Sequence, residues 1–160
     1  MSKAFAYEEL DEVDRELLRL LQEDGTLSSA ALGERLSMTV TPCWRRRKRL
    51  EELGLIKDYQ ANLDRKKLGY DVMAFALVRF GNHSAEAPDD FEQVILKLPQ
   101  VLSCHKVTGE ADYVLTVLAT DLESYGRFVE EVLRRQPGIA SIQSSLALRE
   151  IKAVSRVPVR

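Results

Sequence analysis

Apolar residues recur at intervals of three and four near the N-terminus, which is the spacing of amphipathic helices. The first such stretch begins after Asp11 or Asp14, either of which can cap a helix, and it ends at the Asp-Gly pair 24–25. A second, shorter stretch begins at Ser28 or Ser29. The pattern predicts two packed helices with these inward positions: Val13, Leu17, Leu18, Leu20, Leu21, Ala31, Leu32 and Leu36.

The segment 39–56 combines signals for a third helix with a run of cations. Thr39 or Thr41 can cap the helix start, and Pro42 suits the first turn because its missing N–H costs nothing there. Gly54 is a stop signal. A short helix, a three- or four-residue turn and a capped third helix form a helix-turn-helix arrangement. Five consecutive positions of the third helix are basic: Arg45, Arg46, Arg47, Lys48 and Arg49.

A basic helix in this context favours DNA binding over a merely solvated charged face. Cations release counterions from phosphates, and the free amides of a helix start add partial positive charge. The small residues Thr39, Thr41 and Cys43, with Pro42 beside them, would let the helix tip approach base edges. Cys43 has two other interpretations, a redox-sensitive thiol or a packed small hydrophobe. Trp44 either lies near the bases or packs inside the unit. The side chains expected to hold phosphates are Arg45, Arg46, Lys48 and Arg49.

Partial alternation of apolar and polar residues predicts a strand over 56–63, and the polar segment 64–69 predicts a turn. We therefore divide the chain into a helix-turn-helix domain (1–55), a hinge strand with linker (56–70) and a second domain (71–160).

The second domain carries a weak internal repeat with a period of 38 residues, in which Pro99 recurs as Pro137 and Phe91 as Val129. Each copy reads as strand, amphipathic helix, strand, so two copies predict a βαββαβ sandwich of the ferredoxin-like kind. The fold class of the whole chain is then α+β. The predicted elements are Val72–Phe80, 90–98, 101–107, 112–119, 122–135 and 139–151.

Both faces of the predicted sheet are too apolar to lie in water, and the helices cover only one of them. A second copy of the chain, related by two-fold symmetry, is the expected cover. A homodimer also suits DNA binding, because paired recognition helices read half-sites about one helical turn apart. The strand residues behind this expectation are Val78, Phe80, Val114, Thr116, Leu146 and Leu148.

Composition narrows the class of protein. The 160 residues carry a net charge of −2, so any affinity for nucleic acid must come from local clustering. Cys43 and Cys104 give neither zinc-ligand spacing nor a disulfide framework, and Cys104 and His105 point to opposite faces of a strand and cannot act as a catalytic pair. We expect no enzyme, cofactor, metal or membrane span, and a cytoplasmic location.

The turn between the two repeats, residues 107–113, contains Gly109 between polar residues. Asp112 could pair with an ammonium group while exposed amides hold a carboxylate, so both ends of a free amino acid would be addressed. An ordinary polar hairpin turn is the alternative, and spacing alone favours it.

Two motifs of this chain resemble the Lrp/AsnC family of transcriptional regulators. The segment T-x-T-P-C-W-R-R-x-K-R-L-E, followed by G-L-I, and the opening D-x-x-D-x-x-L-L-x-L-L-Q-x-D-G are similar to the family's winged-type helix-turn-helix. Arg47 departs from the pattern, which usually has an aliphatic residue there. Either its stem lies along apolar surface with the guanidinium in water, or the helix is rotated slightly.

The segment V-x-G-x-x-D-Y-x-L resembles the effector loop of the family's RAM/ACT-like domain. The resemblance implies a small amino-acid effector bound between subunits, with dimers joining into tetramers or octamers. A motif of the last strand, Q-S-S-x-A-x-x-x-I-K, together with T-P-C-W resembles a branch that responds to sulfur or small aliphatic amino acids. An amino-acid-sensing module that regulates a partner enzyme without DNA is the alternative function. The implied effector residues are Thr108, Gly109, Glu110, Asp112, Tyr113, Leu122, Ser144, Ser145 and Leu146.

Overall fold

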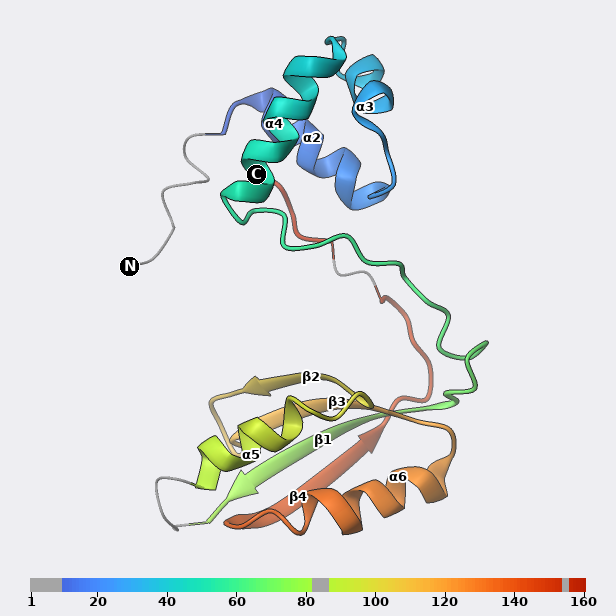
Figure 1. The fold of residues 1–160 in the computed structure, drawn as a ribbon. Coiled ribbons are helices and arrows are strands. Elements are labelled where there is room, and N and C mark those ends of the chain that lie inside the picture. Colours follow the sequence, from blue (N-terminus) through green and yellow to red (C-terminus); the bar gives the residue numbers. More distant parts are fainter. Residues whose placement is uncertain (1–9, 82–86, 154–155) are drawn as a thin grey trace. The chain divides into compact units, whose positions relative to one another are not determined.

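The computed structural model describes residues 10–81, 87–153 and 156–160, which form two compact units. The helical unit comprises Met1–Asn62 and Ala153–Arg160, and the sheet unit comprises Leu63–Lys152. The division after Asn62 falls inside the linker expected from the sequence, and each unit has its own apolar core. Figure 1 labels the elements of both units.

Each described helix of the helical unit begins at a residue that the sequence marks as a cap. The helices are α2 (Glu12–Glu23), α3 (Ser29–Arg35) and α4 (Val40–Glu52). Asp11 caps α2, because its Oδ1 accepts from the backbone N of Asp14 at 2.8 Å. Ser28 caps α3 by accepting from the N of Ala31 at 3.2 Å. Thr39 is the N-cap residue of α4, but its side chain makes no cap bond.

The turn between α3 and α4 is tight and depends on a glycine. Ser37 adopts φ 53°, in the left-handed region. Gly33 lies so close to the turn that a Cβ there would stand 2.7 Å from the carbonyl oxygen of Met38. The core beneath this turn consists of Leu10, Leu17, Leu21, Leu32, Cys43 and Leu50.

The strand predicted over 56–63 is wrong. Residues 57–64 form neither helix nor strand, because no other described segment pairs with their backbone. Alternation alone indicated a two-sided segment, but a strand also needs a neighbour.

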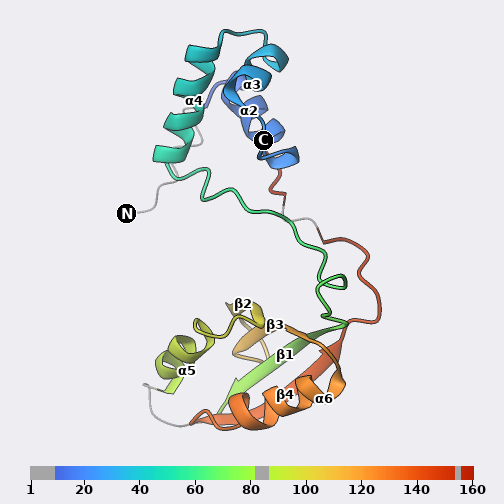
Figure 2. The same cartoon turned by 45° about the vertical axis from the view of Figure 1, so that its right-hand side comes forward.

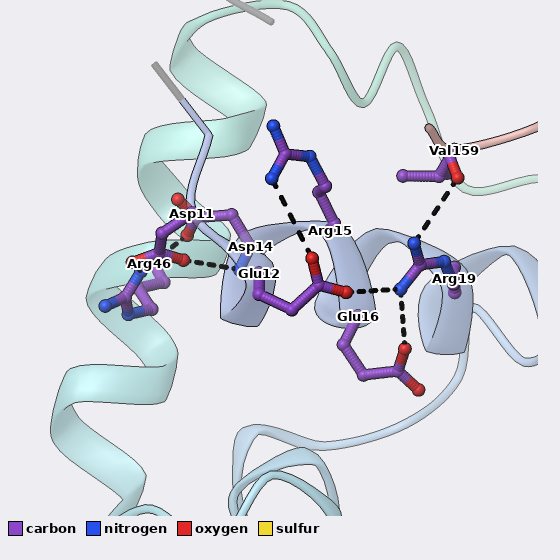
Figure 3. Close-up of polar contacts among 8 residues, drawn as sticks. All are labelled: Asp11, Glu12, Asp14, Arg15, Glu16, Arg19, Arg46 and Val159. Carbon is purple, nitrogen blue, oxygen red and sulfur yellow. Dashed lines mark hydrogen bonds and ion pairs between the residues drawn. The ribbon is translucent and has the colours of Figure 1, made fainter. Parts of the chain in front are cut away.

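The C-terminal residues belong to the helical unit, so the predicted second domain, 71–160, extends too far. The side-chain amide of Gln22 on α2 donates to the carbonyl oxygen of Val157 at 3.0 Å and accepts from its N–H at 2.6 Å. Arg19 donates to the carbonyl oxygen of Val159 at 3.4 Å, as Figure 3 shows. Residues 156–160 are therefore held along α2.

The sheet unit has the predicted βαββαβ order. Its elements are β1 (Val72–Phe80), α5 (Ala87–Ile95), β2 (Val101–Lys106), β3 (Tyr113–Ala119), α6 (Leu122–Phe128) with its continuation η1 (Val129–Leu133), and β4 (Ile139–Leu146). The strands lie in the order β2-β3-β1-β4, and all neighbours are antiparallel. The last strand is shorter than predicted and ends at Leu146.

Both helices cover one face of this sheet, as Figures 1 and 2 show. On β1 the even-numbered residues, such as Ala74 and Ala76, point into the core between sheet and helices. The odd-numbered ones lie on the other face, where Phe75 is 38% exposed. The strand residues on which the expected dimer rested are divided between the two faces. Val114 and Thr116 lie on the open face, Val78, Phe80 and Leu146 lie on the helix side, and Leu148 follows the end of β4.

Candidate functional site

The outer face of α4 presents polar, aromatic and basic side chains to solvent. Thr41, Trp44, Arg45 and Lys48 are spaced by three and four residues, so they share one face of the helix. All four are exposed, and Trp44 is 50% exposed. The Nζ of Lys48 lies 5.4 Å from the centroid of the Trp44 indole ring. No ion pair of Arg45 is found in the part of the chain that the structure describes.

The inner face of α4 packs on the rest of the unit. Cys43 is completely buried, so it does not lie near bases as expected from its place at the helix tip. Burial also raises the pKa of its thiol, which keeps the sulfur protonated and unreactive. Cys43 is a packing residue of the core it shares with Leu50, and the redox interpretation has no support.

Arg46 is bonded inside the helical unit. Its Nη1 donates to Oδ2 of Asp11 at 2.6 Å and to Oδ1 of Asp14 at 2.8 Å, as Figure 3 shows. Arg49 donates through Nη2 to the other oxygen of Asp14. The two carboxylates raise the pKa of Arg46, while the Asp14 amide and Arg46 lower the pKa of Asp11. This geometry argues against the expected role of Arg46 in holding a phosphate. Arg49 is paired with Asp14 through Nη2 but remains partly exposed, so only part of its guanidinium group can reach a phosphate.

Arg47 is bonded rather than solvated, which answers the question raised by its unusual position. Its Nε donates to Glu51 at 3.1 Å and to the hydroxyl of Tyr59 at 3.0 Å, and its Nη1 donates to the carbonyl of Leu27 at 3.0 Å. The guanidinium lies 4.6 Å from the Tyr59 ring centroid, and that ring packs against Gly25. Arg47 thus joins α4 to the segment that leaves the unit.

The loop between β2 and β3 closes as a short hairpin, with the backbone N of Val107 bonded to the carbonyl of Asp112 at 2.9 Å. Thr108, Gly109 and Glu110 are exposed at its tip, and Gly109 has φ 116°, where glycine is favoured. The carboxylate Oδ2 of Asp112 accepts from the backbone N of Phe80 at 2.7 Å. Asp112 therefore joins the loop to β1 through Oδ2. This bond does not use its other carboxylate oxygen, Oδ1.

Tyr113 does not face this loop, contrary to the expectation. It is 2% exposed and points into the core, where its hydroxyl donates to Glu92 on α5 at 2.5 Å. Burial and the neighbouring carboxylate raise its pKa. Its role in the structure is to join β3 to α5.

The remaining expected effector residues lie away from the hairpin loop, on β4 and at the start of α6. Leu122 begins α6 and is 60% exposed, while Leu146 ends β4 beside Ala74. Ser144 points to the helix side, where its Oγ accepts from the hydroxyl of Tyr125 at 2.6 Å, and the adjacent Ser145 lies on the open face. Ser144, Ser145 and Leu146 pair with Ala76, Phe75 and Ala74, so they lie about 10–17 Å from Asp112 along the strands, at roughly 3.3 Å per residue. β1 also lies between their strand and β3. The two groups do not form one site within a single chain.

The partners of the cations of α4 were not predicted from the sequence. Asp14, at 0% exposure, was considered only as a possible cap, and Tyr59 only as part of a strand. A signal for Asp14 did exist, because it falls three residues before Leu17 and seven before Leu21, on the buried stripe of α2. No comparable signal pairs Tyr59 with Arg47.

Neither a metal centre nor a membrane segment is found in the described ranges. No group of three or more His, Cys, Asp or Glu residues within residues 10–81, 87–153 and 156–160 could hold a metal ion. None of the helices described there is long and apolar enough to cross a bilayer.

Family models match both units. Residues 10–57 match the model described as winged helix-turn-helix DNA-binding, and residues 73–157 match that of the Lrp/AsnC ligand binding domain. Together the two models span nearly all of the described chain.

Individual relatives agree. The DNA-binding transcriptional activator DecR of Escherichia coli is 39% identical over 150 residues, covering 94% of this chain and 99% of DecR. Transcriptional regulator AzlB of Bacillus subtilis is 37% identical, covering 94% of this chain and 96% of AzlB. The crystal structure of the regulator NMB0573 from Neisseria meningitidis, in complex with L-Met, superposes with a TM-score of 0.90 at 37% identity and covers 93% of this chain and 96% of that one.

Proposed function

The chain belongs to the Lrp/AsnC family and is a DNA-binding transcriptional regulator with an amino-acid ligand-binding domain, and we propose that the outer face of α4 is the surface that binds DNA. Thr39 and Thr41 lie nearest the base edges, with Pro42 and Trp44 beside them, and Arg45 and Lys48 hold phosphates. The observation that carries this proposal is the exposed row of Thr41, Trp44, Arg45 and Lys48 on one face of a capped helix.

Binding to duplex DNA tests the proposal. Trp44 is the single tryptophan of the chain, so its fluorescence should change when a duplex selected from a random library is added. Arg45→Gln should weaken binding to every duplex and reduce the slope of log K against log salt by about 0.9 per bound helix. Arg127→Gln, which replaces an exposed arginine of α6, is the matched control and should leave the slope unchanged. An unchanged slope in Arg45→Gln would remove Arg45 from the interface.

We also propose that two copies of the chain join through the open face of the sheet. Among the described residues of the sheet unit, α5 and α6 both lie on the opposite face (Figure 2), and the apolar residues of the open face include Met73, Phe75, Leu77 and Val114, beside Thr116. Phe75→Glu would place a charge in such an interface and should shift sedimentation towards monomer. Leu96→Glu, which replaces an exposed apolar residue near α5, should not. Equal assembly in the two variants would place the interface elsewhere.

The sheet unit is further proposed to bind a small amino acid between copies of the chain. Thr108–Glu110 with Asp112 stand at one end of the sheet, whereas Ser145 and Leu146 lie on β4 and Leu122 follows β3 at its other end. Because β1 and more than about 10 Å along the strands separate the groups, we infer that one small ligand touches both only when they come from different copies. Tetramers or octamers built from dimers satisfy this condition. The L-Met bound to the Neisseria regulator and the sulfur-type motifs of this chain favour methionine or a related amino acid as the effector.

Thermal unfolding in the presence of each of the twenty amino acids tests the effector proposal. A ligand at one hundred times its dissociation constant adds about 2.7 kcal/mol to the stability of the folded state. Asp112→Asn keeps an acceptor for the Phe80 amide but removes the charge, so it should lose the shift. Asp58→Asn, an exposed change in the helical unit, should keep it. A full shift in Asp112→Asn would remove Asp112 as the ammonium partner.

A further inference from the structure

We propose that Asp14 is a positioning and specificity-determining residue, which holds two arginines of α4 away from the DNA backbone. This inference rests on the proposed DNA-binding function of α4. Asp14 touches no DNA in this scheme and acts through Arg46 and Arg49. It thereby decides how many of the five cations can attract any duplex, whatever its sequence.

The geometry around Asp14 carries the inference. Its side chain is 1% exposed, and each of its two oxygens accepts from a different arginine of α4. Arg46 is also bonded to Asp11, the cap of α2, so it is held between two carboxylates (Figure 3). Because both arginines reach back from one helix to one buried carboxylate, the rotation of α4 about its axis is fixed. The same rotation directs Arg45 and Lys48 outwards.

The charge balance shows what the arrangement does to DNA binding. Three carboxylates, those of Asp11, Asp14 and Glu51, are bonded to the cations of α4. Among the residues that the structure describes, they leave two of the five positive charges, those of Arg45 and Lys48, without a paired carboxylate. Each phosphate contact contributes about 0.9 to the salt slope of binding on any sequence. Limiting those contacts lowers non-specific affinity, so base contacts at the helix tip make up a larger share of the total.

Stability alone would not require this arrangement. Paired charges are costly to bury, and apolar residues of similar volume are often as stabilising. A leucine in place of Asp14 would continue the stripe of Leu17 and Leu21 on α2. The carboxylate has a consequence that leucine could not have, because it determines where two guanidinium groups point.

The test measures the affinity of the full-length protein for a random-sequence duplex and for a duplex selected from a random library, between 50 and 200 mM salt. Asp14→Asn keeps the shape of the side chain but should release Arg49 and loosen Arg46, which keeps its bond to Asp11. We expect the salt slope on the random duplex to rise by up to about 1.8 per bound helix. Over this fourfold salt range each added phosphate contact multiplies the loss of affinity by about 3.5. Two added contacts would multiply it by up to about 12. The ratio of specific to non-specific affinity should fall.

A control separates release of arginines from a change in net charge. Glu123→Gln removes one carboxylate, that of an exposed ion pair with Arg127 on α6, and should leave the slope at the wild-type value. A slope that rises equally in both variants would overturn the proposal.

A second pair of variants decides the matter even if Asp14→Asn does not fold. Arg46→Gln and Arg45→Gln each remove one positive charge from neighbouring positions of α4, and Arg46→Gln leaves Asp14 paired with Arg49. We expect Arg45→Gln to lower the slope by about 0.9 and Arg46→Gln to leave it unchanged. An equal decrease in both variants, or an unchanged slope in folded Asp14→Asn, overturns the inference. A wild-type protein that binds no duplex at 50 mM salt overturns the DNA-binding proposal and this inference with it.

Discussion

The turn between α3 and α4 offers a sharp test of how the helix-turn-helix is held together, through the variant Gly33→Ala. Gly33 is buried in α3, and its carbonyl accepts from the backbone N of Met38 at 2.9 Å. An added Cβ would stand 2.7 Å from the carbonyl oxygen of Met38. Backbone lies on both sides of this contact, so no flexible side chain can move to relieve it. The turn itself must open.

The magnitude follows from two opposing effects. Alanine in place of glycine inside a helix stabilises by up to about 1 kcal/mol. Overpacking of a well-filled site costs about 1–3 kcal/mol, and a clash with backbone belongs near the upper end. The helical unit should therefore lose about 1–2 kcal/mol. For a unit of this size, each kcal/mol lowers Tm by roughly 4–8 °C. The affinity for DNA should fall as well, because the turn sets the place of α4 relative to α3.

Differential scanning calorimetry is a suitable assay, since two compact units can unfold in separate transitions. Gly126→Ala is the matched control. Gly126 lies in α6 with no atom within 4 Å of its added Cβ, so this variant should stabilise the sheet unit by about 0.4–1 kcal/mol. If Gly33→Ala were as stable as the wild type, the close approach of α3 to the turn would not be a constraint of the fold, and our reasoning would be refuted.

Three further predictions concern protons, thiols and one hydroxyl. The pKa of Asp11 lies below its usual value of 3.8 in the folded state. The stability that the Asp11 carboxylate contributes is therefore complete above pH 3.8 and is lost as the pH falls through the lowered pKa. Asp11→Asn, which still caps α2, should show a smaller acid-induced loss of Tm than the wild type. Cys43 should stay unmodified by a thiol reagent until the protein unfolds, because it is buried and its pKa is raised, and labelling at the rate of a free thiol would contradict its burial. Tyr125→Phe removes the bond to Ser144 and should cost about 0.5–1.5 kcal/mol in denaturant unfolding, whereas no cost would mean that the hydroxyl is satisfied by water.

Much of the fold could be predicted because local signals and tertiary packing agree. β1 was predicted with the bounds that the structure gives it, Val72–Phe80, since a nine-residue apolar segment there is flanked by glycines on both sides. The start of α4 was marked by Thr39 and Pro42 and its end by Gly54, which has φ 71°. In such segments the glycines, prolines and capping residues at the ends determine where the helix or strand begins and ends.

The errors arose where structure depends on a partner distant in sequence. The segment 56–63 alternates in part between apolar and polar residues, but whether it forms a strand depends on a neighbour that the alternation cannot reveal. The C-terminal residues 156–160 carry no periodic signal. Contacts of Val157 with Gln22 and of Val159 with Arg19, 135 and 140 residues away in sequence, assign them to the helical unit.

The candidate sites were less predictable than the fold for the same reason. A run of five cations indicates charge, but it does not say which cations are neutralised within the protein. Arg46 and Arg49 are paired with Asp14 across 32 and 35 residues of sequence, and Arg47 with Tyr59 across 12. Side-chain partners of this kind depend on how the helices pack, and that information is absent from a single motif.

The same distinction bears on how an effector could act on DNA binding. An amino acid that binds between copies of the sheet unit, as proposed, changes DNA binding only by as much as its affinity differs between assemblies of the protein. Arg47 on α4 donates a hydrogen bond of 3.0 Å to the hydroxyl of Tyr59, one of the first residues of the linker. The ring of Tyr59 also packs on Gly25. A change of assembly that pulls on the linker is therefore resisted at α4 itself. Arg47, the departure from the family pattern, thus lies where the linker leaves the surface proposed to bind DNA.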